Sequence, residues 1–153
     1  MVAGGDKPGR TCLDLRMAFE IHPRLASGGF EIGRLDGCRL LLKNTSIFPT
    51  FILIPEVEGI EDLHELPEDQ FHDVMAAMRR VSEFVSTRFR PEKLNVACIG
   101  NQVRQMHIQI IGRSTGDPAW PGTVWAFEGK QPYDPAEAAS IIADARAFLG
   151  IPV

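Results

Sequence analysis

Hydrophobic and polar positions alternate along Leu94–Arg113, and the pattern predicts two strands joined by a short polar turn that contains glycine. In the second strand, Gln105, His107 and Gln109 fall on one face, because side chains along a strand repeat every two residues. The other face carries only methionine and isoleucine and should pack on a core. A polar face on an antiparallel strand usually meets solvent. A row of uncharged Gln, His and Gln beside a glycine turn, which can form an anion-binding concavity, also fits a ligand site.

Similar patterns predict the other elements of the chain. They are strands at Phe30–Leu35, Cys38–Lys43 and Thr50–Ile54, a long helix at Leu66–Phe89, and a final helix at Pro135–Leu149. Asp36-Gly37 is a strong hairpin signal between the first two of these strands. Leu13–Phe19 is ambiguous between a short helix and a strand. An antiparallel sheet of about five strands, with one long helix packed on it and a C-terminal helix, is an α+β domain.

Length and composition describe an ordinary globular chain. Its 153 residues suit a single domain spanning 1–153, with a mobile tail expected at 1–12 and a helical C-terminal extension at 126–153. The net charge is −4 and basic residues are dispersed, which argues against nucleic-acid binding and a membrane surface. No apolar run is long enough to span a bilayer, and the N-terminus lacks the apolar core of a signal peptide. We therefore expect a cytoplasmic protein.

The residues from Gly100 to Ile111, GNQVRQMHIQII, resemble the signature of the histidine triad (HIT) superfamily, in which three histidines alternate with apolar residues after a glycine-containing turn. The similarity extends over about Phe19–Trp125, where DPAWPGTVW resembles HIT-like hydrolases of the diadenosine tetraphosphate hydrolase type. Gln105 and Gln109 replace the first and third histidines, so His107 is the only one that remains. A glutamine in third place is similar to the galactose-1-phosphate uridylyltransferase branch.

This resemblance implies that His107 attacks the α-phosphorus of a nucleotide derivative and forms a nucleotidyl-histidine, which water or another acceptor resolves. Imidazole is suited to this role at neutral pH if its other ring nitrogen is held by a hydrogen bond to a carbonyl. The expected phosphate-binding donors are Asn101, Gln102, Gln105 and Gln109. A carboxamide at Gln109 does not titrate and cannot protonate a leaving group, which favours phosphate or polyphosphate leaving groups, as in dinucleoside polyphosphates.

Several residues keep two interpretations. Asn44 lies near the position where, by resemblance, the family contacts the ribose, but it could equally stabilise its own turn. Trp120 and Trp125 could cap the core or fold over a nucleotide, and capping is the commoner role of aromatic residues. His64 and His72 are expected on the solvent side of the long helix, without a third ligand that would make a metal site. His22 is expected to be structural or exposed. No cofactor is implied.

Three functions remain open from the sequence. The first is a nucleotide hydrolase or nucleotidyltransferase that uses His107, with hydrolysis favoured. The second is a nucleotide-binding module with little or no turnover, because two histidines of the signature are missing. The third is an interaction protein with a vestigial site. By resemblance, the expected partners are a small-molecule nucleotide and a second copy of the chain in a two-fold homodimer.

Overall fold

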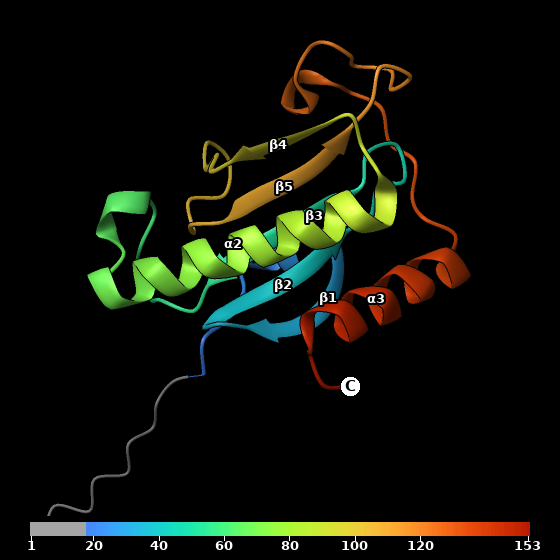
Figure 1. Cartoon of the computed structure of the whole chain (residues 1–153). Helices are drawn as coiled ribbons and strands as arrows, with labels where there is room; N and C mark the ends of the chain where they lie inside the picture. The colour runs from blue at the N-terminus through green and yellow to red at the C-terminus, as the bar shows by residue number, and fades with distance from the viewer. Residues whose placement is uncertain (1–17) are drawn as a thin grey trace, which may run out of the picture.

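A computed structural model describes residues 18–153 of the chain, and five antiparallel strands form one sheet in the order β1-β2-β3-β5-β4 (Figure 1). The tail predicted at 1–12 and most of Leu13–Phe19 lie outside the described residues. The strands are β1 (Gly29–Leu35), β2 (Cys38–Lys43), β3 (Thr50–Pro55), β4 (Lys93–Ala97) and β5 (Ile108–Arg113). The helices are α1 (Pro23–Ala26), α2 (Glu68–Phe89) and α3 (Pro135–Leu149), with 3₁₀ turns η1 (Leu63–Glu65) and η2 (Val124–Ala126). The predicted α+β class is confirmed.

Local signals explain how the first hairpin and the two long helices end. Asp36 and Gly37 both have positive φ, 46° and 74°, which is the backbone that a two-residue hairpin needs between β1 and β2. Arg90 ends α2 in the left-handed conformation, immediately before a proline. The side chain of Asp134 caps α3 by accepting hydrogen bonds from two backbone N–H groups, and Gly150 ends that helix at φ 70°. The two long helices therefore begin and end within two residues of their predicted limits.

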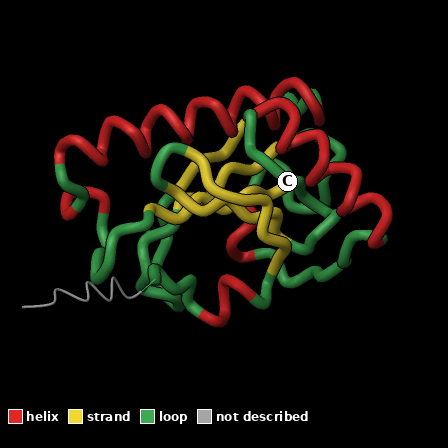
Figure 2. The backbone as a smooth tube through the Cα atoms, turned by 90° about the horizontal axis from the view of Figure 1, so that it is seen from below, coloured by secondary structure: helices red, strands yellow, loops and turns green. Residues whose placement is uncertain are grey.

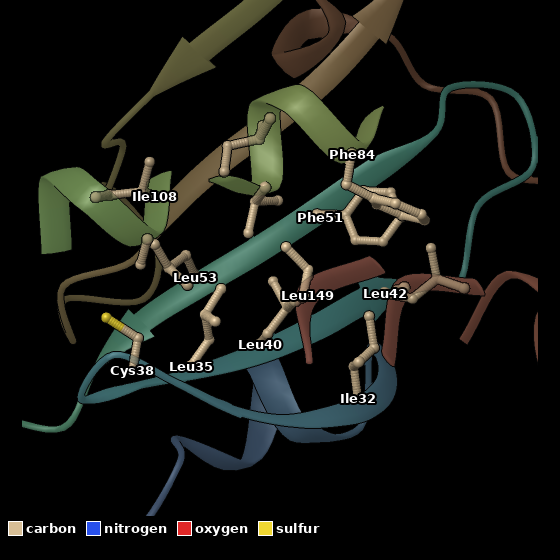
Figure 3. Close-up of a cluster of buried hydrophobic side chains, with 14 of the residues drawn as sticks. Ile32, Leu35, Cys38, Leu40, Leu42, Phe51, Leu53, Phe84, Ile108 and Leu149 are labelled. Atoms are coloured by element: carbon tan, nitrogen blue, oxygen red, sulfur yellow. The ribbon is translucent and has the colours of Figure 1, made fainter. Parts of the chain in front are cut away.

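The sheet has two faces with different contents. Helices α2 and α3 lie against one face, and α1 lies with loops on the other (Figure 2). Side chains on the helix-covered face form the main core, which includes Leu40, Phe51 and Phe84 (Figure 3). The neighbouring residues Leu41 and Ile52 point to the opposite face and belong to a smaller cluster that includes Leu25 of α1. The chain thus buries one face for stability and leaves the other partly open. No helix in residues 18–153 is long and apolar enough to cross a membrane.

The predicted short turn within Leu94–Arg113 is wrong, because strand β5 begins only at Ile108 and residues 98–107 form a loop. The pairing of β3 with β5 ends at Leu53 and Ile108. Beyond that point the backbone N–H of Met106 donates to the carbonyl of Ile60 at 3.1 Å instead of to a neighbouring strand. The predicted apolar face is confirmed, since Met106, Ile108 and Ile110 lie in the main core. Gln105 and His107 are nevertheless loop residues and not strand residues.

A buried arginine holds the segment that follows β5. Arg113 is 2% exposed, and its guanidinium donates two hydrogen bonds to the carboxylate of Asp117, at 2.7 and 3.0 Å. It also donates to the side chain of Asn95 and to the carbonyl of Gly122, both at 2.8 Å. This cluster fixes the polypeptide between β5 and η2, which carries Trp125 back over the sheet.

Replacement of Arg113 by methionine should destabilise the fold strongly. The carboxylate of Asp117 would remain largely buried without its partner, and loss of one member of a buried ion pair costs about 3 to 5 kcal/mol. Urea denaturation measures the change in the free energy of unfolding. The matched control is Arg34→Met, which removes an exposed ion pair with Glu56 and should cost less than about 1 kcal/mol. Equal losses in both variants would contradict this account of Arg113.

The same cluster should make stability depend on pH in acid. The hydrogen bond from Arg113, followed by those from the backbone of Ser114 and Ala119, lowers the pKa of Asp117 below its ordinary value. This contribution to stability is complete above the unfolded-state pKa and is lost as pH falls through the lower folded-state pKa. We therefore expect the stability gap between the parent and Asp117→Asn to shrink from about pH 6 to about pH 3. A gap that stays constant in urea titrations across this range would contradict the assignment.

Candidate functional site

A cavity of about 410 Å³ opens on the sheet face that the long helices leave uncovered. Its wall comes from four parts of the chain: α1, the sheet, the 98–107 loop and η2. The polar residues that line it are Arg24, Lys43, Asn101, Gln102, His107 and Gln109. Trp125 and several aliphatic side chains supply the apolar part of the lining. The structure therefore brings His107 together with three of the four predicted phosphate-binding residues.

His107 is held in one orientation at the base of this cavity. The residue is 4% exposed, and its Nδ1 lies 2.8 Å from the backbone carbonyl oxygen of Gln105. A carbonyl oxygen can only accept, so Nδ1 must carry the hydrogen and donate it. Nε2 of the neutral ring then has a free lone pair. This is the tautomer that a nucleophile in the cavity requires.

Gln109 follows His107 by two residues and shares its side of the sheet. Its Oε1 accepts a hydrogen bond at 3.1 Å from the indole Nε1 of Trp125, which lies on η2. This contact fixes which end of the carboxamide is the oxygen and leaves the NH₂ group to donate. Of the two interpretations of Trp125, the structure supports the one in which it lines the site, whereas Trp120 is 36% exposed and lies near the Arg113 guanidinium.

Gln105 has a different environment from the other predicted phosphate-binding residues. Its Nε2 donates to the carbonyl of Glu20 at 2.9 Å, and its Oε1 accepts from the backbone N–H of His22 at 2.8 Å. The side chain is not part of the cavity lining. It joins the segment before α1 to the loop that carries His107, so it determines where one wall of the cavity lies.

Asn101 and Gln102 lie in the exposed part of the 98–107 loop and face the cavity. The Oε1 of Gln102 accepts a hydrogen bond at 3.3 Å from the guanidinium of Arg24 on α1. Arg24 was not among the residues predicted from the sequence. Four residues of helix give no periodic signal, and nothing local places that side chain beside a loop nearly eighty positions later. The loop therefore presents amide groups next to a cation.

The end of β2 presents a lysine and not the predicted asparagine. Lys43 lines the cavity, whereas the Oδ1 of Asn44 accepts a hydrogen bond at 2.9 Å from the backbone N–H of Tyr133. Although the Lys43 side chain is exposed overall, desolvation of its amine lowers its pKa. The Asn44 side chain joins the turn after β2 to the segment before α3. This role is close to the structural interpretation of Asn44, in which its side chain stabilises its own turn. Strand alternation could have identified Lys43, because Leu41 shares its face.

The other histidines, and the described cysteines Cys38 and Cys98, do not line the cavity. His64 and His72 are exposed, as predicted, and His22 caps α1 through its ring. Within residues 18–153, no group of three or more His, Cys, Asp or Glu side chains could hold a metal ion. Partial burial raises the pKa of the Cys98 thiol, which the backbone N–H of His107 contacts, so this group is a neutral thiol at neutral pH.

Comparison with known proteins identifies the family. The family model described as HIT domain matches residues 28–116, which is more than half of the chain. The chain belongs to the HIT domain family. HIT proteins generally bind or hydrolyse nucleotides, and the matched range includes all five strands and His107. It ends before Trp125 and excludes α1 and α3.

Solved HIT structures resemble this chain over nearly their whole length. A histidine triad protein from Marinobacter aquaeolei is 38% identical, with a TM-score of 0.83, and the match covers 87% of this chain and 97% of that one. One from Sinorhizobium meliloti is 32% identical, with a TM-score of 0.84, covering 87% and 98%. One from Bradyrhizobium japonicum is also 32% identical, with a TM-score of 0.84, covering 86% and 98%. Comparison with curated proteins gave no significant match.

Removal of the Gln105 side chain should loosen the cavity wall without unfolding the protein. In Gln105→Ala the backbone N–H of His22 and the carbonyl of Glu20 lose their partner, which costs about 1 kcal/mol for groups near solvent. We expect faster hydrogen exchange at the His22 amide and unchanged exchange in α2, measured by NMR. Gln70→Ala, an exposed glutamine on α2, is the matched control and should leave the His22 amide protected. Unchanged exchange at His22 in the Gln105 variant would contradict the bridging role.

Proposed function

We propose that this HIT protein is a nucleotide hydrolase in which His107 attacks the α-phosphorus of a nucleotide derivative such as a dinucleoside polyphosphate. The observation that carries the proposal is the 2.8 Å contact between Nδ1 of His107 and the carbonyl oxygen of Gln105. The carbonyl can only accept, so the hydrogen lies on Nδ1, and whenever the ring is neutral its lone pair is on Nε2, the atom that would form the bond to phosphorus. A buried ring on a fixed loop also loses little orientational freedom when it reacts.

The first step exchanges one bond at phosphorus for another. The Nε2 lone pair of His107 forms a bond to the α-phosphorus, and the bond from phosphorus to the bridging oxygen breaks, with its electrons leaving on the polyphosphate. Negative charge on the phosphorus oxygens is stabilised by the amide donors of Asn101, Gln102 and Gln109, with Arg24 next to them. Loss of one well-placed donor in such a site costs about 3 to 4 kcal/mol of transition-state stabilisation.

The second step releases the nucleotide. A water oxygen forms a bond to the same phosphorus, the bond to Nε2 breaks, and the water proton passes to bulk solvent or to the departed phosphate. No carboxamide in the cavity lining can donate a proton at neutral pH, so Gln109 does not assist a basic leaving group. Phosphate and polyphosphate leave without that assistance, and amines do not. This supports anhydride substrates over phosphoramidates.

A nucleotide-binding module with little turnover is the second candidate. Gln105 supports it, because that carboxamide is engaged with the backbone of the preceding segment and does not line the cavity. The cavity then offers three of the four predicted phosphate-binding side chains instead of four. Binding of adenosine monophosphate without product formation from any dinucleoside polyphosphate or nucleoside phosphoramidate would favour this candidate over the hydrolase.

His107→Ala should abolish formation of the covalent intermediate. Incubation with radiolabelled diadenosine tetraphosphate at low temperature, followed by an alkaline quench, should leave label on the parent protein and none on the variant. Steady-state hydrolysis should fall by at least about a thousandfold, because the nucleophile is lost. His72→Ala, which removes an exposed histidine on α2, should retain both activities. Hydrolysis by His107→Ala at the parent rate would exclude His107 as the nucleophile.

A further inference from the structure

The cavity has a marked electrostatic character in a chain whose net charge is −4. It is lined by two cationic side chains, Arg24 and Lys43, and no described residue of the lining is acidic. Within residues 18–153, neither cation forms an ion pair with a carboxylate. Both side chains are largely exposed and need no partner for stability, but a concave site lined by charges of one sign attracts ions of the opposite sign. Two unpaired cations in one concave site therefore indicate a ligand with more than one negative charge.

The two cations come from different elements of the cavity wall. Arg24 contacts the side chain of Gln102 and so lies beside the amide donors of the 98–107 loop. Lys43 is the last residue of β2, which β3 separates from β5, and its side-chain amine has no hydrogen-bond partner among the described residues. Lys43 therefore does not help to hold the 98–107 loop, and that role does not explain why a lysine lies at this position.

The sheet register gives the separation of Lys43 from His107. Leu41, Ile52 and Gln109 are paired across β2, β3 and β5 and form one row on the cavity face. Because β2 and β5 both run antiparallel to β3, they run parallel to each other. Lys43 therefore lies two residues beyond this row in one direction and His107 two residues beyond it in the other.

Four residues along the strands and two strand spacings across them correspond to roughly 13 Å and roughly 10 Å between the two backbones. A ligand that contacts both the amine of Lys43 and the ring of His107 therefore extends across the row formed by Leu41, Ile52 and Gln109. The aliphatic side chains of Ile52 and Leu25 line the cavity along with the indole of Trp125, and they suit an apolar or planar body between the two polar ends.

We propose that Lys43 is a specificity-determining residue that binds a second anionic group, a phosphate or carboxylate, on the part of the substrate remote from the reacting phosphorus. The proposal rests on the proposed function, because it takes His107 to mark the reacting end. The substrate class is then a phosphate anhydride of a nucleotide that carries an additional anionic group on its nucleoside portion. A nucleotide with a neutral nucleoside portion would leave Lys43 without a partner.

The test compares adenosine 5′-monophosphate with adenosine 2′,5′-bisphosphate and adenosine 3′,5′-bisphosphate as ligands of the parent protein, by isothermal titration calorimetry at low salt. None of these ligands carries an anhydride, so binding can be measured without turnover. One charge-assisted contact is worth about tenfold in Kd, and we expect at least one bisphosphate to bind tighter by about that factor. Equal or weaker binding of both bisphosphates would overturn the proposal.

Variants then assign the preference to one side chain. Lys43→Met should remove the bisphosphate advantage while leaving monophosphate affinity within about threefold, and Lys43→Glu should reverse the preference, which a purely steric role would not do. Arg24→Met should weaken all three ligands equally. Lys93→Met, an exposed lysine on β4, is the matched control and should retain the parent pattern. A preference that survives Lys43→Met would overturn the proposal, whereas failure of covalent trapping on His107 would affect only the hydrolase.

Discussion

The hydrogen bond from Nδ1 of His107 to the carbonyl of Gln105 is the constraint on which the site depends. It determines the tautomer, and the position of the carbonyl determines the direction in which Nε2 points. That carbonyl is held by interactions on both sides of it. The Gln105 side chain binds the backbone before α1, Arg104 forms an ion pair with Glu61 at 2.8 Å, and the Met106 amide binds the carbonyl of Ile60. A loop that looks irregular is thus fixed at three successive residues.

The two faces of the sheet divide the work of stability and of ligand binding. The helix-covered face buries an almost purely hydrophobic core, and this burial supplies most of the stability. The opposite face can then carry groups that would be costly inside a core, among them an imidazole, amides and two cations. Arg113 connects the stability of the fold to the site. Its buried guanidinium donates hydrogen bonds to the Asp117 carboxylate and the Gly122 carbonyl, and these hold the segment that places Trp125 against Gln109.

Local patterns predicted the hairpin at Asp36-Gly37, the long helices and the split between the two faces, because each depends on residues close in sequence. The loop at 98–107 could not be predicted in this way. Its backbone and side chains pair with residues near 20 and 60, and no periodicity reports such partners. Lys43 and Asn44 show that the roles of two adjacent residues are hard to assign from the sequence. Strand alternation places the lysine on the same face as Leu41, but no local pattern shows that this face lines a cavity or that the neighbouring asparagine binds Tyr133.

The most direct measurement of the central claim is the protonation pattern of the His107 ring in the free protein. Long-range ¹H–¹⁵N correlation spectra of protein labelled with ¹⁵N-histidine, with the signal assigned by its absence in His107→Ala, distinguish a protonated nitrogen from one with a free lone pair. At neutral to mildly alkaline pH the account predicts hydrogen on Nδ1 and a free lone pair on Nε2. Hydrogen on Nε2 with a bare Nδ1 would contradict both the contact with Gln105 and the nucleophilic role of His107.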